Sequence, residues 1–210
     1  MSTSGHVIAL LGAESTGKTT LAAALAAALV EGGRDAVVVD EYLREFCQTQ
    51  QRTPERHEQA GIAAEQQRRI ELAAAAHRIV VADTTSLMIA VYSDQVFGDT
   101  SLYRMAEAAQ RRCRATLVTA LDLPWAADGL QRDGSHVREP VDAKLRAALR
   151  RGGIDYAVIA GAGPARLEAA LAAAQRALEP PRDDPSTPRW HWVCERCGDT
   201  DCERHLLPPA

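Results

Sequence analysis

Residues 12–19, GAESTGKT, match the pattern G-x-x-x-x-G-K-[ST] at every required position. Glycines let the backbone curl so that successive N–H groups face phosphate oxygens. An apolar run precedes the loop and an amphipathic pattern follows it, which is the context that the motif requires and a simple glycine turn does not. The sequence therefore predicts a site for ATP or GTP, with Lys18 on the β- and γ-phosphates and Thr19 on Mg²⁺. Its expected members are Gly12, Ala13, Glu14, Ser15, Thr16, Gly17, Lys18, Thr19 and Thr20.

Acidic residues follow two short β-branched runs, where a parallel sheet would bind its ligands. Asp40 and Glu41 follow AVVV, and Asp83 follows IVVA. At the carboxyl end of a strand, an acid can hold magnesium or its waters, or take a proton from an acceptor hydroxyl. Asp83 suits the magnesium side, and Asp40 or Glu41 suits the acceptor side. The alternative is that these acids only cap the helices that follow them.

Three arginines could supply the positive charge that phosphoryl transfer needs in its transition state. Arg132 and Arg138 belong to the segment 124–140, whose two glycines could act as hinges, and Arg44 follows the second predicted strand. We expect Arg132 and Arg138 on a loop that closes over the phosphates, and Arg44 beside the acceptor. The alternative is that they are solvated surface residues. The chain has no N-K-x-D guanine-reading signature, which argues against a switch GTPase.

The C-terminal tail carries a cysteine pattern of its own, C-x2-C-x4-C-x2-H. Tetrahedral zinc accepts three thiolates and one imidazole, and four filled positions leave none for a catalytic water. The pattern predicts a structural zinc site, in which His191 could replace the last ligand. The alternatives are a disordered tail with free thiols, or a docking segment that packs through its tryptophans. The expected ligands are Cys194, Cys197, Cys202 and His205.

The elements that must position these residues alternate between strand and helix. Apolar runs predict strands over 6–11, 36–40, 78–83, 115–122 and 155–161, and helical spacing predicts helices over 18–31, 54–77, 86–97, 101–113, 141–153 and 164–179. This alternation predicts an α/β fold, with a parallel sheet covered by helices on both faces. We expect a main domain over 1–179, a proline-rich linker over 180–189 and the cysteine-rich tail over 190–210.

Composition narrows the class of protein. The 210 residues carry a net charge of −4, so the chain has no electrostatic footprint for nucleic acid or an anionic membrane. The N-terminus lacks the basic start and apolar run of a signal peptide, and the alanine-rich runs are too interrupted to span a bilayer. We expect a cytoplasmic protein, in which a cysteine cluster is more often a metal site than a disulfide framework.

Several segments together resemble the ribosylnicotinamide kinase domain of NadR-type proteins, an AAA-type ATP-binding domain. They are LLGAESTGKTTLAAALA, DEYLREF, EQQ, VVADTTSLMIAVYSDQVFG, LDLPWAADGLQRD and GPARLEAAL, in the family's order over roughly residues 5–178. The resemblance implies a P-loop kinase fold with strand order 2-3-1-4-5. It also implies transfer of the ATP γ-phosphate to the ribose 5′-hydroxyl of nicotinamide riboside, giving nicotinamide mononucleotide.

The resemblance also assigns residues. It implies the ATP loop over 12–19, Asp83 near magnesium, an acceptor side that includes Glu41, Tyr42 and Arg44, and a lid with Trp125, Asp128 and Arg132. The chain departs from the family where it reads D-G-L-Q-R instead of an arginine one or two residues after D-G. It also reads D-T-T after the third strand instead of D-T-D. Both departures leave other nucleoside-type or small-molecule acceptors open.

Two functions follow from these patterns. The first is a Mg-ATP-dependent small-molecule kinase in which Asp40 or Glu41 orients or deprotonates the acceptor, while Lys18, Arg132 and Arg138 stabilise the transferred group. The second is an ATP-binding regulator whose zinc tail contacts a protein partner. The paired acids and the arginine-bearing loop favour the kinase, since a switch needs no acceptor pocket. The tail favours the regulator.

Overall fold

The computed structural model describes residues 4–125 and 135–179. Its five strands form one parallel sheet in the order β2-β3-β1-β4-β5, which confirms the expected fold class and strand order. The strands are β1 (His6–Leu11), β2 (Ala36–Val39), β3 (Ile79–Asp83), β4 (Ala115–Thr119) and β5 (Ala157–Ile159). The helices are α1 (Lys18–Glu31), α2 (Tyr42–Gln50), α3 (Gln59–Ala76), α4 (Ser86–Phe97), α5 (Tyr103–Gln110), α6 (Arg138–Arg151) and α7 (Gly163–Leu178), with 3-10 turns η1 (Arg56–Glu58) and η2 (Ser135–Val137).

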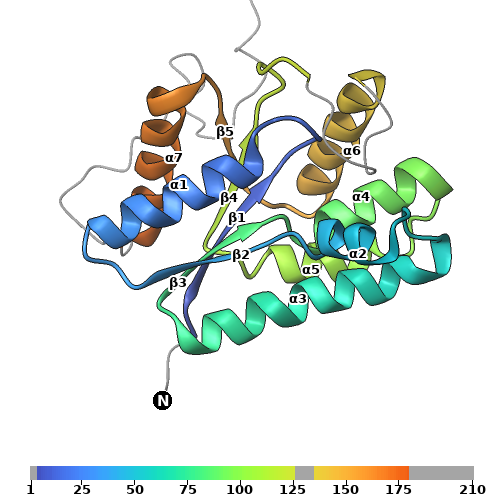
Figure 1. Cartoon of the computed structure of the whole chain (residues 1–210), viewed down its shortest axis with the longest axis horizontal. Helices are drawn as coiled ribbons and strands as arrows, with labels where there is room; N and C mark the ends of the chain where they lie inside the picture. Colours follow the sequence, from blue (N-terminus) through green and yellow to red (C-terminus); the bar gives the residue numbers. More distant parts are fainter. Residues whose placement is uncertain (1–3, 126–134, 180–210) are drawn as a thin grey trace, which may run out of the picture. The chain divides into compact units, whose positions relative to one another are not determined.

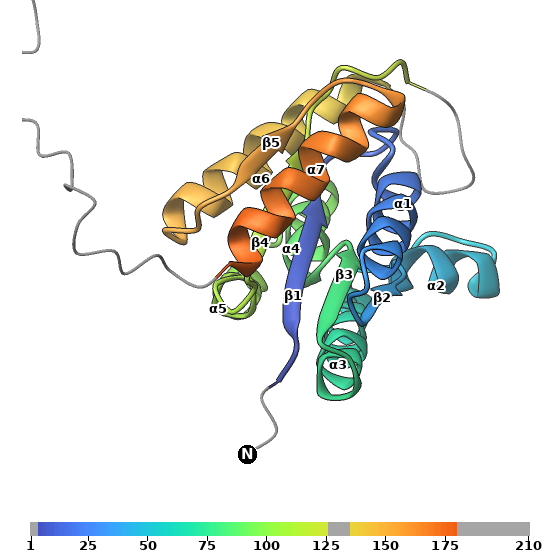
Figure 2. The same cartoon turned by 90° about the vertical axis from the view of Figure 1, so that its left-hand side faces the viewer.

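Helices cover both faces of the sheet (Figure 1). Because side chains alternate along a strand, Ile8 and Leu10 of β1 face α1 and α7, whereas Ala9 and Leu11 face α4, α5 and α6. Figure 2 turns the side that carries α1 and α7 toward the viewer. On the opposite face, α3 packs on β2 and β3 through Ile70. The described residues thus form the three layers that the alternating pattern predicts.

The ends of the helices follow from local chemistry. Helix α1 ends at two glycines, and Gly33 takes a φ of 78°, a conformation that disfavours most side chains. Thr85 caps the start of helix α4, because its hydroxyl accepts a hydrogen bond from the N–H of Leu87. The helix ends before Gly98, which has a φ of 64°. The loops that follow β1 and β3, ahead of these two helices, lie at the carboxyl edge of the parallel sheet.

Several expected boundaries were wrong. Helix α2 was not anticipated, although Leu43 and Cys47 lie four residues apart and are both buried in it. The helix expected over 54–77 begins at Gln59, after the separate turn η1. Helix α6 begins at Arg138, ahead of Pro140, because a proline in the first turn removes an N–H that has no partner within the helix anyway. Arg138 therefore lies in a helix and not, as expected, on a loop.

Candidate active site

The phosphate loop joins β1 to α1 and is shaped by its first glycine. Gly12 has a φ of 148°, and a Cβ atom there would lie 2.1 Å from the Oγ1 of Thr119. Glycine at this position leaves room for that hydroxyl and adopts the positive φ without strain. Helix α1 begins at Lys18, so its first N–H groups face the loop, as a phosphate site requires. This is the backbone arrangement that the motif predicts.

Hydrogen bonds from distant elements hold the loop in place. The hydroxyl of Thr16 donates to the carbonyl of Ala13 at 2.7 Å and lies 2.7 Å from the hydroxyl of Thr119. Arg166 of α7 donates to the carbonyl of Thr16 at 2.9 Å and to a carboxylate oxygen of Asp122 at 2.8 Å. Only 4% of Arg166 is exposed. The loop is therefore held by Thr119 at the end of β4 and by Arg166 of α7, which also binds Asp122.

Charged side chains surround the start of α1. The Nζ of Lys18 donates to the carbonyl of Ala13 at 2.8 Å. One terminal nitrogen of Arg44 donates to Thr19 Oγ1 at 3.3 Å and to a carboxylate oxygen of Glu41 at 3.2 Å. Arg44 thus connects the end of the phosphate loop to the acid that follows β2.

The two adjacent acids Asp40 and Glu41 have different surroundings. Asp40 is exposed, whereas only 9% of the Glu41 side chain is exposed. Burial raises the pKa of Glu41, and the nearby charge of Asp83 raises it further, while Lys18 and Arg44 act to lower it. Glu41 lines the cavity described below and Asp40 does not. Of the two acids, Glu41 is therefore the one placed to contact a ligand in that cavity.

Asp83 ends β3 as a buried acid and is 1% exposed. Among the residues that the structure describes, neither of its carboxylate oxygens has a hydrogen-bond partner. It is not a helix cap, because the cap of α4 is Thr85, and Glu41 at the start of α2 makes no capping hydrogen bond either. Buried carboxylates without partners are rare in proteins unless a cation or water completes them. Asp83 and the Thr19 hydroxyl are therefore chemically suited to Mg²⁺ or its waters.

A cavity of about 530 Å³ extends from the phosphate loop. One side is made of the loop and the residues after β2, from Glu14 through Thr20 together with Glu41 and Arg44. The other side is formed by α2, the segment before α3 and the last turns of α4. Sequence reasoning missed this second group, whose only local signal is an aromatic pair late in the α4 pattern. Its members are Leu43, Thr53, Pro54, Glu55, Arg56, Gln59, Tyr92, Val96 and Phe97.

Besides Asp40, six expected site residues among those that the structure describes are absent from the cavity lining: Gly12, Ala13, Tyr42, Asp83, Trp125 and Arg138. The guanidinium carbon of Arg69 lies 4.4 Å from the centroid of the Tyr42 ring, so this ring faces α3. Arg138 is 8% exposed and donates to the carbonyl of Leu123 at 2.9 Å, which holds the segment after β4. Trp125, at the end of the first described range, is 36% exposed.

Some expected residues cannot be placed. Asp128, Arg132 and the zinc ligands Cys194, Cys197, Cys202 and His205 lie outside the described residues, as do the expected linker and tail. Within 4–125 and 135–179, no three histidine, cysteine or acidic residues cluster as metal ligands. No helix in the same ranges has the length and apolar character needed to span a membrane.

Comparisons with known proteins agree with the fold. A sequence model of the family described as AAA domain matches residues 7–166. No curated protein matches the chain. The structure of NadR protein in complex with NR superposes with a TM-score of 0.67 at 20% identity, covering 82% of this chain and 50% of that one. NadR in complex with NAD and AMP-PNP gives 0.63 at 21% identity, covering 82% and 49%.

A further neighbour is a nucleotide kinase. Thymidylate kinase from Ehrlichia chaffeensis superposes with a TM-score of 0.58 at 15% identity, covering 84% of this chain and 100% of that one. The present chain spans about half the length of the two NadR chains. These likenesses show a P-loop kinase fold, the fold that the resemblance implied.

Proposed function

The chain belongs to the AAA domain family, and from that premise we propose that it is a kinase for nicotinamide riboside. In the proposed reaction the acceptor's 5′-hydroxyl oxygen bonds to the γ-phosphorus of ATP, the bond to the departing ADP breaks, and the hydroxyl proton passes to Glu41. The products are nicotinamide mononucleotide and ADP. The broader part of the proposal, a nucleoside or nucleotide kinase, has support from two kinds of structural neighbour.

One observation carries this proposal: the phosphate loop and a partly aromatic pocket belong to the same cavity. Lys18 and Thr19 line the nucleotide side, and Tyr92 and Phe97 line the other side. A volume of about 530 Å³ is within the usual range for a small-molecule site. The flat faces of Tyr92 and Phe97 suit the ring of a nucleoside. A nucleotide-dependent switch needs no second pocket beside its phosphates.

Each residue then has a chemical role. Glu41 accepts the acceptor's proton, and its raised pKa brings it closer to the neutral range in which a general base is most effective. Lys18 neutralises charge on the transferred phosphoryl group, and Arg44 does so from the acceptor side. Mg²⁺, held by Thr19 and Asp83, would supply further positive charge on the β- and γ-phosphates. Arg132 remains a candidate for the closing loop.

The test is to measure ADP formation and product masses with the purified full chain, magnesium and ATP. The acceptor panel contains nicotinamide riboside, common nucleosides and nucleoside monophosphates, and Lys18→Ala is the blank. We expect nicotinamide riboside to gain one phosphoryl group at a rate about 10²–10³-fold above the blank. Faster phosphorylation of another nucleoside would contradict the assignment of nicotinamide riboside as the acceptor. ATP binding without phosphorylation of any compound would contradict the proposal that the chain is a kinase.

A further inference from the structure

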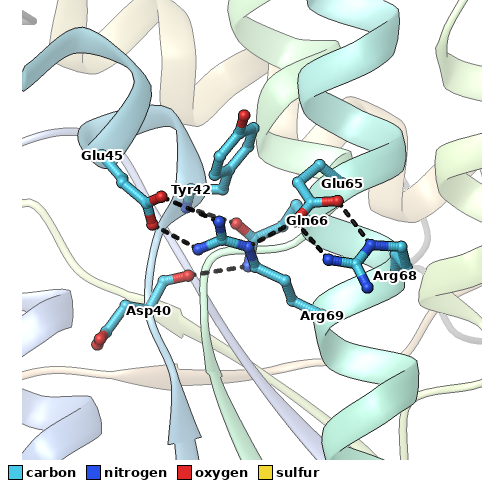
Figure 3. Close-up of polar contacts among 7 residues, drawn as sticks. All are labelled: Asp40, Tyr42, Glu45, Glu65, Gln66, Arg68 and Arg69. Carbon is cyan, nitrogen blue, oxygen red and sulfur yellow. Dashed lines mark hydrogen bonds and ion pairs between the residues drawn. The ribbon is translucent and has the colours of Figure 1, made fainter. Parts of the chain in front are cut away.

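Gln66, in the middle of α3, is a fully buried polar residue that touches two catalytic loops. None of it is exposed to solvent. Its Oε1 accepts the backbone N–H of Tyr42 at 2.7 Å, and its Nε2 donates to the carbonyl of Asp40 at 3.3 Å (Figure 3). The same Nε2 donates to the carbonyl of Thr84 at 3.3 Å. A primary amide has two N–H donors and one carbonyl acceptor. Here all three functions are used, and every partner is backbone.

The three backbone partners of Gln66 lie next to two acids, Glu41 and Asp83. The carbonyl of Asp40 and the N–H of Tyr42 are the backbone groups on either side of Glu41. The Gln66 side chain therefore hydrogen-bonds the backbone both before and after that acid. The third partner, Thr84, directly follows Asp83. Gln66 therefore contacts the backbone beside each of the two acids to which we assign chemistry.

The sheet itself does not provide this connection. Pairing between β2 and β3 ends with Val39 opposite Ala82, one residue before Asp40 and Asp83. Among the described residues, no backbone hydrogen bond joins the segments that follow β2 and β3 beyond that point. The amide of Gln66, which has the same donor and acceptor groups as a peptide bond, bridges the gap.

The backbone after β3 is also unusual. Thr84 has a φ of 79°, a conformation that is rare for a β-branched residue. Such a conformation persists only where surrounding contacts hold it, and it often marks functional sites. The hydrogen bond from Gln66 to the Thr84 carbonyl is one of these contacts.

We propose that Gln66 is a positioning residue, whose amide sets the spacing between the acceptor-side acid Glu41 and the metal-side acid Asp83. The inference rests on the proposed function, because these are the two acids of that reaction. A misplacement of about 1 Å of a reacting group can cost about 10²-fold in rate. Gln66 acts through the backbone of both loops and touches neither substrate.

The structure also provides a way to separate this role from packing. Helix α2 is attached to α3 independently of Gln66, through the ion pairs of Arg69 with Glu45, at 2.5 and 3.0 Å, and the Tyr42 ring (Figure 3). Replacing the amide should therefore leave α2 docked. The next residue, Gln67, is a matched control, because its amide donates to Glu71 at 2.9 Å in an exposed hydrogen bond within α3.

The experiment compares the full chain with Gln66→Met, Gln66→Glu and Gln67→Met. Methionine keeps the length without the hydrogen bonds, and glutamate keeps an acceptor for the Tyr42 N–H but loses both donors. Three quantities are measured: the thermal midpoint, the Kd of ATP with magnesium and with EDTA, and kcat and KM for nicotinamide riboside. The Kd values do not need an acceptor, so they test Gln66 even if nicotinamide riboside is not the substrate.

We expect both Gln66 variants to bind metal-free ATP within about twofold of the wild type, since the phosphate loop is untouched. They should lose most of the magnesium-linked gain in ATP affinity, and kcat should fall about 10- to 100-fold with little change in KM. Gln67→Met should match the wild type throughout. A lower thermal midpoint with unchanged kcat and magnesium linkage would overturn the proposal. Failure of both Gln66 variants to fold while Gln67→Met folds would equally assign Gln66 a structural role alone.

Discussion

At the scale of single residues, position relative to the cavity decides which of two adjacent acids can act. Asp40 and Glu41 are neighbours after β2, yet only Glu41 lines the cavity and contacts Arg44. Burial, with the charge of Asp83, raises the pKa of Glu41 above its ordinary value. A carboxyl group with a raised pKa keeps its proton to a higher pH. The rate of a reaction that needs the ionised carboxylate therefore rises at a higher pH than it would with an ordinary glutamate.

Neutralising Glu41 should therefore stop proton transfer. We expect Glu41→Gln to lower kcat about 10²- to 10⁴-fold, because glutamine keeps the size of the side chain but cannot accept the proton. Asp40→Asn, the matched neighbouring change, should leave kcat near the wild-type value. Both are measured as initial rates of ADP formation with saturating substrates.

The pH dependence gives the second half of this test. In the wild type, kcat/KM should rise with pH and level off above the pKa of Glu41, which lies higher than that of an ordinary glutamate. The residual rate of Glu41→Gln should lack this rise. If Asp40→Asn abolishes the rise and Glu41→Gln preserves it, the assignment of the base is reversed.

At the scale of elements, a short buried chain of hydrogen bonds fixes the start of α4. Thr85 caps the helix through Leu87 and donates to the amide oxygen of Gln110 at 2.7 Å, and Gln110 in turn donates to Thr116 at 2.9 Å. All of these bonds are buried, so they connect α4, α5 and β4 at a site shielded from water. Asp83, the last residue of β3, lies two residues before Thr85 in the chain.

Breaking this chain should destabilise the domain. We expect Thr85→Ala to lower the free energy of unfolding by about 2 kcal/mol, since it removes a helix cap and leaves a buried amide oxygen without its donor. Equilibrium unfolding in urea measures the change. Thr100→Ala, at an exposed position before α5, is the control and should have little effect. Equal effects of the two substitutions would show that the Thr85 hydroxyl contributes nothing beyond that of a surface threonine.

Two elements show where local patterns are insufficient. Helix α2 has only nine residues, and its charged side chains obscure the buried pair Leu43 and Cys47. Helix α6 includes Arg138, whose buried guanidinium donates to the carbonyl of Leu123, fifteen residues earlier. Tertiary contacts decide both cases, and they outweigh the weak propensities of short segments.

At the scale of the whole molecule, the sheet and the helices on both its faces are formed within residues 6–178. A set of elements with its own core can fold independently. We expect a chain ending at residue 179 to melt at the same temperature as the full chain and to keep its kcat for nicotinamide riboside. Calorimetry and initial rates measure both.

The same shortened chain tests the prediction for the tail. If Cys194, Cys197, Cys202 and His205 bind zinc, the full chain carries about one zinc ion and the shortened chain carries none. Metal analysis after dialysis measures this. If the shortened chain folds but has lost turnover, the independent kinase domain is contradicted. That result would favour the ATP-binding regulator, or a kinase whose activity depends on the tail.

The sequence by itself determined the phosphate loop, the alternation of strands and helices, and the acids at the ends of β2 and β3. These features depend on neighbours along the chain, such as the spacing of glycines and the run of apolar residues before each acid. The strand order, implied by resemblance to a kinase family, is also what the structure shows.

Only the tertiary structure decided that Glu41 and not Asp40 lines the cavity and that Tyr92 and Phe97 share it with the phosphate loop. It also decided that Gln66 hydrogen-bonds the backbone beside both acids. The contacts responsible join distant parts of the chain: Arg166 braces Thr16 across 150 residues. Such contacts depend on how the helices pack against the sheet, because packing and not local spacing determines which side chains of different elements meet.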